Sequence, residues 1–375
     1  MQQEYIYWMA LAHVERMRTL RKNEIVVHCY ERSLSLSDFF QGEPAWWMEE
    51  FGLAAEEAEW VEFAKNELSN YSFLAEDLLE QGYELIPIIS PDYPKTLKLN
   101  LKKTYAPPLL YIKGNSQLLQ AACVAIVGSR SASDLALQFA DNVAQKAVEE
   151  GKAVVSGYAK GVDKQALDSA LKYGGSSIVV LPQGIATFAS GIKALYRELV
   201  SGRVVTVSAF HPKAPWSAGL AMARNPIIYG MADEIFVAES DSKGGTWSGV
   251  VDGLRKKRRI YVRESLPAEK NANHLLIEKG AFPVSLQGEI LVREKGISSN
   301  TDETVSEEEG LEQKIRLLLK GTKLTSKEIL ERLSLEWPSR KMTDYLKNMP
   351  DIEPQGRSPK KFTLKGTGAE PTLFG

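Results

Sequence analysis

The sequence predicts an α/β protein: a Rossmann-like, doubly wound parallel sheet with an N-terminal helical domain and a C-terminal winged-helix-like domain. One observation is a series of short apolar runs, such as Cys123-Val-Ala-Ile-Val, typical of parallel strands buried on both faces. Helical stretches separate these runs, and that alternation specifies a parallel sheet. The composition, 375 residues with 44% hydrophobic and 25% charged, suits a globular chain of about two or three domains.

The region before the sheet divides into two segments. Residues 1–82 are expected to form a helical domain, since Leu11, Val14 and Met17 recur at three-residue spacing. Residues 83–122 combine two short strand patterns with a proline-rich turn. We expect them to be a connector packed on the core.

The Rossmann-like domain is expected over residues 123–294. Its first strand leads into a helix beginning at Asp134, in which alanine, valine and phenylalanine recur with helical period. Gly151 is placed to end this helix as its C′ residue. Further strands are predicted at 153–156, 177–181, 204–207, 234–238 and 259–262.

The last part of the chain has its own pattern. Residues 295–310 are expected to be an acidic, solvated linker. Residues 311–366 read as three helices followed by a β-hairpin, with a capping box at Thr325–Glu328. Basic side chains gather on the third helix and the hairpin: Arg340, Lys341, Arg357, Lys360, Lys361 and Lys365. Such a face suits nucleic acid, although winged modules also bind proteins.

The loop after the first parallel strand carries the strongest binding signal. Ligands of open α/β sheets bind at the carboxyl ends of strands, at the topological switch point. Gly128 permits close backbone approach, Ser129 and Ser131 offer hydroxyls, and Arg130 offers a forked cation. The helix that follows presents free N–H groups to an anion. The loop is not G-x-G-x-x-G, so a dinucleotide is disfavoured and no cofactor is expected.

Three other segments offer glycines, cations and polar side chains suited to phosphate. They are Gly157, Lys160 and Gly161 after the second strand, Arg224 and Asn225, and the helix start Lys243, Gly244, Gly245 and Thr246. Taken singly, each is also an ordinary turn, and the convergence of the loops favours a binding site. No nucleophile–base pair stands out, so no catalytic residue is expected.

Several classes of protein are disfavoured. Cys29 and Cys123 lie far apart in apolar surroundings, which indicates buried thiols in a reducing compartment. The four histidines form no ligand pair, so no metal site is expected. There is no signal-peptide pattern and no run near the roughly 20 apolar residues of a membrane helix. We therefore expect a cytoplasmic protein without membrane contact.

Several motifs taken together resemble the DNA-processing protein A (DprA/Smf) family. They are Asp92-Tyr-Pro94, Pro108-Leu-Leu-Tyr-Ile-Lys-Gly114, Val124-Ala-Ile-Val-Gly-Ser-Arg130 and Val155-Ser-Gly-Tyr-Ala-Lys-Gly-Val-Asp163. The resemblance extends over about 200 residues in order and spacing, and the flanking domains are also similar. It implies a non-enzymatic protein that binds single-stranded DNA, forms a homodimer, protects incoming strands and assists RecA loading during DNA uptake. It assigns phosphate binding to Gly128, Ser129 and Arg130, and a further role to Arg224 and Asn225.

The sequence also departs from the family pattern. The family usually has Phe-Pro-x-Arg-Asn-Arg where this chain has Ala221-Met-Ala-Arg-Asn-Pro226, so the aromatic that stacks on a base is missing there. Lys243-Gly-Gly-Thr246, beside Glu239, resembles nucleotide-binding branches of the same superfamily. The alternative is therefore a diverged sensor that binds or hydrolyses a small nucleotide.

Overall fold

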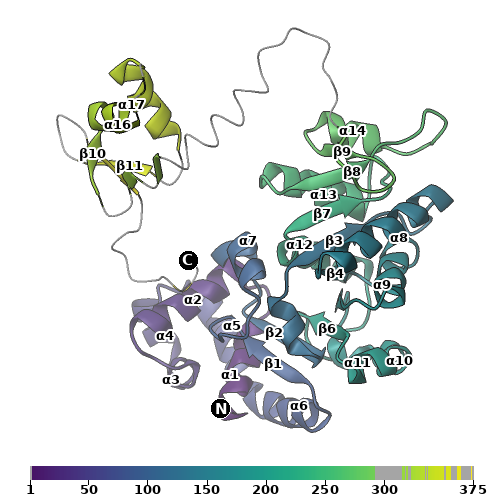
Figure 1. Cartoon of the computed structure of the whole chain (residues 1–375). Coiled ribbons are helices and arrows are strands. Elements are labelled where there is room, and N and C mark those ends of the chain that lie inside the picture. Colours follow the sequence, from purple (N-terminus) through teal and green to yellow (C-terminus); the bar gives the residue numbers. More distant parts are fainter. Residues whose placement is uncertain are drawn as a thin grey trace. The chain divides into compact units, whose positions relative to one another are not determined.

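A computed structural model describes residues 2–291 and, in the C-terminal part, 315–316, 318–319, 322–333, 335, 337–349, 352–355, 361–364 and 373. Its contacts divide the chain into two compact units, residues 1–292 with 373–375, and residues 293–372 (Figure 1). Each unit has a hydrophobic core of its own.

The N-terminal region is helical, as the sequence predicted. Its helices are α1 (Gln2–Ala12), α2 (Thr19–Glu31), α3 (Leu36–Gln41), α4 (Pro44–Glu50), α5 (Ala55–Asn66) and α6 (Leu68–Glu80). Aromatic rings fill the space between them. The buried Trp47 indole donates to the Phe39 carbonyl at 2.8 Å, and the Phe39 ring meets Phe51 edge-to-face at 4.8 Å. The indole N–H therefore has a partner despite its burial.

A nine-stranded sheet forms the centre of the first unit. Its strands are β1 (Glu84–Pro87), β2 (Leu109–Gly114), β3 (Cys123–Val127), β4 (Ala153–Ser156), β5 (Ser177–Val180), β6 (Val204–Ser208), β7 (Glu234–Val237), β8 (Ile260–Arg263) and β9 (Phe282–Val284). Their spatial order is β1-β2-β6-β5-β4-β3-β7-β8-β9. From β6 to β9 all neighbours are parallel. The doubly wound parallel sheet predicted from the sequence is therefore confirmed.

The strand order fixes where a ligand site is expected. From β3 the chain steps through β4, β5 and β6 in one direction, and β7 then returns to the other side of β3. The switch point therefore lies between β3 and β7. Val127 pairs with Val237, so these two strands end at the same level. The loops that follow them start side by side.

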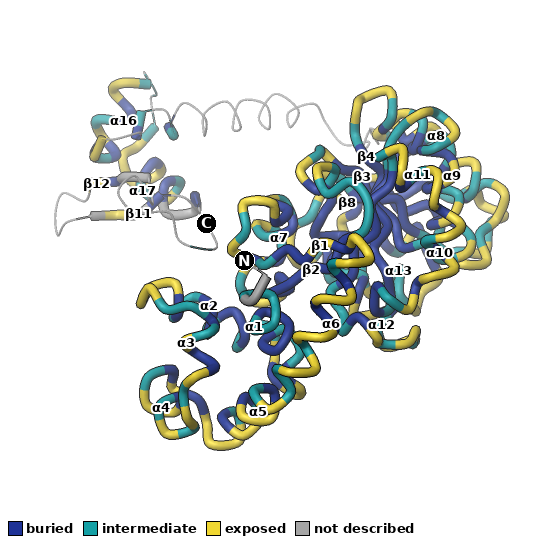
Figure 2. The backbone as a smooth tube through the Cα atoms, turned by 90° about the horizontal axis from the view of Figure 1, so that it is seen from below, coloured by how far each residue is buried: buried dark blue, intermediate teal, exposed yellow. Residues whose placement is uncertain are grey.

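Helices cover both faces of the sheet (Figures 1 and 2). On one face lie α8 (Asp134–Glu149) and α9 (Val162–Lys172), and on the other α12 (Ala218–Met231) and α13 (Gly245–Arg255). Besides α7, which is described below, the other helices described in this unit are η1 (Ser116–Gln120), η2 (Ile185–Thr187), α10 (Ala189–Ala194), α11 (Tyr196–Val200) and α14 (Asn273–Glu278).

The strand β3 shows why the predicted strands are apolar throughout. Val124 and Ile126 pack in the core that includes α8, whereas Ala125 and Val127 pack in the core on the opposite face. Both faces exclude water, so neither set of alternate positions is polar.

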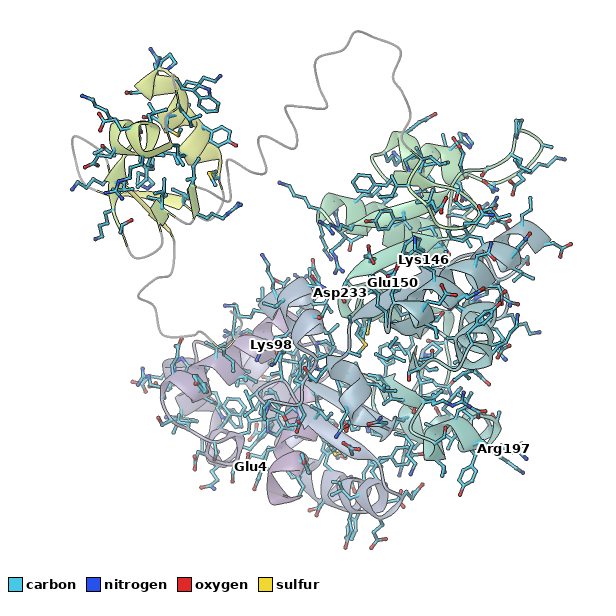
Figure 3. The ribbon with its side chains drawn as sticks, viewed as in Figure 1. Glu4, Lys98, Lys146, Glu150, Arg197 and Asp233 are labelled. Carbon is cyan, nitrogen blue, oxygen red and sulfur yellow. The ribbon has the colours of Figure 1, made fainter. Side chains whose placement is uncertain are left out.

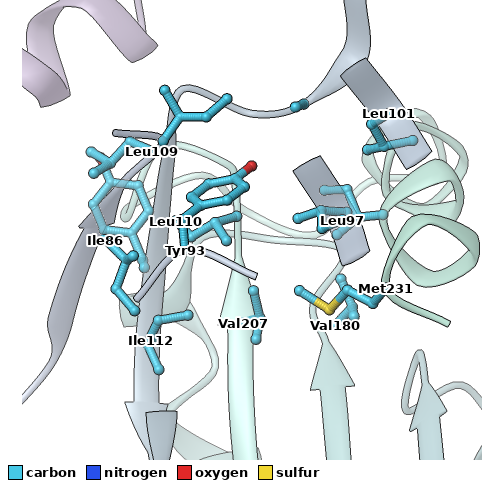
Figure 4. Close-up of a cluster of buried hydrophobic side chains, with 14 of the residues drawn as sticks. Ile86, Tyr93, Leu97, Leu101, Leu109, Leu110, Ile112, Val180, Val207 and Met231 are labelled. Carbon is cyan, nitrogen blue, oxygen red and sulfur yellow. The ribbon is translucent and has the colours of Figure 1, made fainter. Parts of the chain in front are cut away.

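Residues 83–122 contribute strands to the main sheet. β1 and β2 pair antiparallel with each other, and β2 pairs antiparallel with β6. The helix α7 (Lys95–Tyr105) packs on α12. Figure 4 shows Leu97 and Leu101 of α7 beside Met231 of α12, within the buried cluster that joins this segment to β5 and β6. The continuous core makes the first 292 residues one compact unit.

The second unit has the winged-helix elements predicted from the sequence. Helical residues 315–316 and 318–319 precede α16 (Ser326–Leu333) and α17 (Ser339–Asn348). Three antiparallel strands follow the order β10 (Leu324–Thr325), β12 (Lys361–Leu364) and β11 (Ile352–Gln355). The predicted capping box is present, since Thr325 N–H donates to Glu328 at 2.7 Å and Glu328 N–H to the Thr325 hydroxyl at 3.3 Å.

The predicted basic face is only partly described. Arg340, Lys341 and Lys361 are exposed, and the Lys341 ammonium lies 4.1 Å from the centre of the Trp337 ring. Arg357, Lys360, Lys365 and the acidic linker 295–310 lie outside the described residues.

Two further findings bear on the class of protein. Within the described ranges, no helix has the length and apolar character needed to cross a membrane. Nor do His, Cys, Asp and Glu residues in those ranges form a group that could hold a metal ion. Both cysteines are buried free thiols, and burial raises the pKa of Cys29 and of Cys123 to about 12. They are therefore unreactive at neutral pH.

Candidate functional site

The first two predicted loops interlock at the carboxyl ends of β3 and β4. Val162 N–H donates to the Ser129 carbonyl at 3.2 Å. Gly161 has φ +80°, and a Cβ there would lie 2.4 Å from that carbonyl oxygen. A Cβ on Gly128 would lie 2.6 Å from the Val162 side chain. Both glycines are thus required by the close approach of the two loops.

A pocket of about 440 Å³ opens at the switch point between β3 and β7, and we call it the switch-point pocket. Most of the predicted site residues line it: Gly128, Ser129, Arg130, Ser131, Arg224, Asn225, Lys243, Gly244, Gly245 and Thr246. Gly157 and Lys160 line an adjacent pocket, and Gly161 lines neither. The structure therefore brings together segments separated by more than a hundred residues.

The Gly-Gly-Thr segment starts α13 at the rim of this pocket. Gly244 precedes the helix with φ +95°, a conformation that favours glycine. The Thr246 hydroxyl donates to the Gly128 carbonyl at 3.1 Å, and Asn225 Nδ2 donates to the Gly245 carbonyl at 3.3 Å. These bonds tie the loop after β7 to the loop after β3 and to α12, so the pocket has a fixed outline.

Arg224 lies on a helix. Taken alone, the pattern Ala223-Arg224-Asn225-Pro226 could also have been an ordinary turn, but α12 runs continuously through Pro226. Arg224 is buried, because only 3% of its surface is exposed. Its Nη1 donates to the Val180 carbonyl at 3.2 Å and lies 3.9 Å from Asp163 Oδ2. A Cβ on Gly157 would fall 1.3 Å from Nη1, so the guanidinium lies directly on that glycine.

One donor of this buried guanidinium is unused. Within the described part of the chain, Arg224 Nε has no hydrogen-bond partner, and neither has Oη of the buried Tyr229. Both residues line the switch-point pocket. A buried donor without a partner costs roughly 1–3 kcal/mol.

Asp163 is the charged partner of Arg224. Gly161 holds the N-cap position of α9, and Asp163 lies buried in the first turn of that helix. Its carboxylate accepts from Gly157 N–H at 3.2 Å. Burial raises the pKa of Asp163 more than the Arg224 guanidinium lowers it. Burial also lowers the pKa of Arg224. Asp163 thus compensates the buried cation incompletely, and an anion in the pocket would add to that compensation.

Glu239 connects the end of β7 to the start of α8. Its carbonyl accepts from Ser129 N–H at 3.0 Å. Its carboxylate accepts from the hydroxyl and the N–H of Ser133, the residue that caps α8. Glu239 is therefore engaged in holding the first loop.

The adjacent pocket contains aromatic residues that the sequence analysis did not single out as a site. It has a volume of about 470 Å³ and is lined by Tyr158, Phe188 and Trp216, so we call it the aromatic pocket. Arg130, Ser131, Ala159 and Arg224 line both pockets. The three aromatic residues come from three different loops, so no local spacing could have revealed them.

Comparison with known proteins places this site in a family. The model of the family described as DNA recombination-mediator protein A matches residues 84–294, more than half of the chain. The chain belongs to this family. The family resemblance seen in the sequence motifs is thereby confirmed, and every residue that lines the two pockets falls within the range matched to DNA recombination-mediator protein A.

Similarity to individual proteins supports this family assignment. The DNA processing protein DprA of Streptococcus pneumoniae is 29% identical over 214 residues, covering 56% of this chain and 74% of that protein. Protein Smf of Synechocystis is 25% identical over 307 residues, covering 76% of this chain and 75% of its own length. The X-ray structure of S. pneumoniae DNA processing protein A aligns with a TM-score of 0.60 at 23% identity, covering 78% of this chain and 99% of that one. At that identity the likeness shows a common fold.

Proposed function

We propose that this protein binds the phosphate backbone of single-stranded DNA across the switch-point pocket and acts as a binding protein rather than an enzyme. The observation that carries the proposal is that three cations, Arg130, Arg224 and Lys243, line one pocket at the switch point. The family, and relatives named as DNA processing proteins, support DNA as the ligand.

The distribution of cations favours a strand over an isolated phosphate. Arg130 and Arg224 line both pockets, Lys243 lines only the switch-point pocket, and Lys160 only the aromatic pocket. A nucleic-acid strand carries one phosphate per nucleotide, so it can engage cations spread along a groove. A single mononucleotide phosphate would use only one of these positions.

The family supports a proposal for the biological role. We propose that the protein protects incoming single strands during DNA uptake or recombination, and that it passes them to the RecA recombinase as a homodimer. The C-terminal unit, with exposed Arg340 and Lys341 on α17, would add a second contact to nucleic acid.

The test compares oligonucleotide binding by the native protein and by Arg130→Ala. Loss of one phosphate contact should weaken binding strongly and lower the slope of log affinity against log salt by about 0.7. Arg197→Ala is the matched control, because Arg197 is exposed on α11 and lines neither pocket (Figure 3). If the native protein does not bind a long oligonucleotide at low salt, the proposal is wrong.

The alternative is a nucleotide sensor, favoured by the Gly244-Gly245-Thr246 helix start at the same pocket. Against nucleotide hydrolysis, the carboxylate of Glu239 and the hydroxyl of Thr246 are already engaged with Ser133 and Gly128. Thermal-shift measurements with nucleoside mono-, di- and triphosphates distinguish the two functions. Stabilisation by one nucleotide, together with displacement of the oligonucleotide by it, would favour the sensor.

A further inference from the structure

The aromatic pocket offers an exposed ring beside the cations of the switch-point pocket. Trp216 is 53% exposed and lies in the loop between β6 and α12. The next residue, Ser217, caps α12, because its hydroxyl accepts from Leu220 N–H at 3.1 Å. The backbone that carries the indole is therefore anchored to a helix start, while about half of the residue's surface remains open to a ligand.

The rest of the pocket wall is held rigidly. Tyr158 has φ +59°, a left-handed conformation that a bulky residue rarely adopts. Its ring meets Phe188 edge-to-face at 5.3 Å. A Cβ on Gly191 would lie 2.0 Å from the Phe188 ring, so that ring lies directly on the glycine. Strain of this kind, beside a candidate binding loop, is typical of a functional wall.

The charge of the pocket limits what it can hold. Arg130, Lys160 and Arg224 are among its lining residues, and no Asp or Glu is among the described residues that line it. An apolar wall with an open ring and a cationic rim suits a flat, aromatic ligand that carries a negative charge. An unpaired base with its own phosphate has this combination, and base–aromatic stacking needs no particular base.

We propose that the aromatic pocket holds one unpaired base of the strand whose phosphates occupy the switch-point pocket, with Trp216 as the stacking ring. This inference rests on the proposed function and adds a residue that contacts a base, where the proposed function invokes only phosphates. In a duplex the bases are paired and stacked on one another, so none is available to the indole.

The test uses two single strands of equal length and charge, oligothymidine and the same backbone with abasic sites. The native protein should bind oligothymidine more tightly by roughly 5- to 150-fold for each base that is stacked. Trp216→Ala should lower affinity for oligothymidine by a similar factor and leave affinity for the abasic strand unchanged. Its salt slope should equal that of the native protein, because the indole carries no charge.

Two further variants serve as controls for folding and for chemistry. Trp216→Phe keeps a ring and should retain most of the preference, whereas Trp216→Leu keeps an apolar side chain and should lose it. Phe73→Ala, at an exposed ring of α6 that lines neither pocket, should have no effect.

The outcomes separate this inference from the proposed function. Equal binding of both strands by the native protein, or an unchanged preference in folded Trp216→Ala and Trp216→Leu, overturns the role of Trp216 and leaves phosphate binding intact. Absence of oligonucleotide binding by the native protein overturns both proposals. A preference that disappears with both substitutions and persists in Trp216→Phe supports the stacking role.

Discussion

At the scale of single residues, the buried pair of Arg224 and Asp163 has two separable roles. Asp163 binds the backbone of the second loop, through Gly157 N–H, and faces the guanidinium at 3.9 Å. Arg224 donates to the Val180 carbonyl and also lines the switch-point pocket. The first set of contacts concerns stability, and the second concerns ligand binding.

Substituting both residues should separate these roles. Arg224→Met leaves Asp163 buried without its cation, so the free energy of unfolding should fall by about 3 kcal/mol and oligonucleotide binding should be lost. The double variant Asp163→Asn with Arg224→Met removes both charges, so it should recover most of that stability without recovering binding. Urea denaturation and a binding titration on all four proteins of the cycle measure this.

The matched control for this cycle lies on the same helix. Gly219 is exposed near the start of α12, and a Cβ there would meet only the Ser217 hydroxyl at 3.8 Å. Gly219→Ala should leave binding unchanged. Recovery of binding by the double variant would show that Arg224 acts only on stability and does not contact the strand.

At the scale of elements, a histidine cluster joins the N-terminal helices to the sheet. His13, after α1, bonds the Tyr111 hydroxyl of β2 at 2.8 Å and meets the His211 ring edge-on at 5.1 Å. Tyr71 of α6 faces both histidine rings. Burial, then His211 and Lys22, lower the pKa of His13 well below its usual value. Burial and Lys213 lower the pKa of His211.

These shifts predict that stability falls with acid. A histidine whose folded-state pKa is lowered binds its proton more readily in the unfolded chain, so its stabilising contribution is present above about pH 6.5 and decreases below it. The free energy of unfolding, measured by urea titration at a series of pH values, should therefore decrease as the pH is lowered from 7.5 to 5.5. His13→Gln should flatten this dependence, while the exposed His274→Gln should not. An identical pH dependence in His13→Gln and the native protein would contradict the prediction.

Elements whose signal is local were predictable from the sequence. The parallel strands appear as apolar runs because both faces of the sheet are covered, and the α8 helix ends before Gly151, which has φ +69° as expected of its C′ position. The candidate loops were predictable because parallel strands bring their carboxyl ends to one edge. Sequence alone could therefore identify the segments of the switch-point pocket, because the order of the parallel strands brings these loops together at one edge of the sheet.

Elements whose signal depends on tertiary packing were not predictable. Pro226 indicates a turn by local rules, yet α12 continues through it, because its buried neighbours Ile227 and Ile228 pack in the core. The burial of Arg224 was not predictable either, since nothing in its neighbours along the chain indicates burial against β5. The aromatic pocket needs Tyr158, Phe188 and Trp216 to meet from separate loops.

At the scale of the whole molecule, the chain forms two compact units, each with hydrophobic packing of its own. In the first unit, one core extends from the N-terminal helices to one face of the sheet, and another packs on the opposite face. The core of the second unit lies between α16, α17 and the small sheet. A unit with its own core unfolds as its own cooperative transition. The native protein should therefore show two transitions in calorimetry, the larger one from the first unit.

Truncating one core phenylalanine in each unit tests this independence. Phe362 of β12 is 1% exposed and Phe139 of α8 is fully buried, each inside its own core. Removing such a ring costs about 3–5 kcal/mol. Phe362→Ala should lower or abolish only the smaller calorimetric transition and leave binding of a short oligonucleotide by the first unit intact. Phe139→Ala should lower only the larger transition. A parallel shift of both transitions in either variant would mean that the two cores unfold as one.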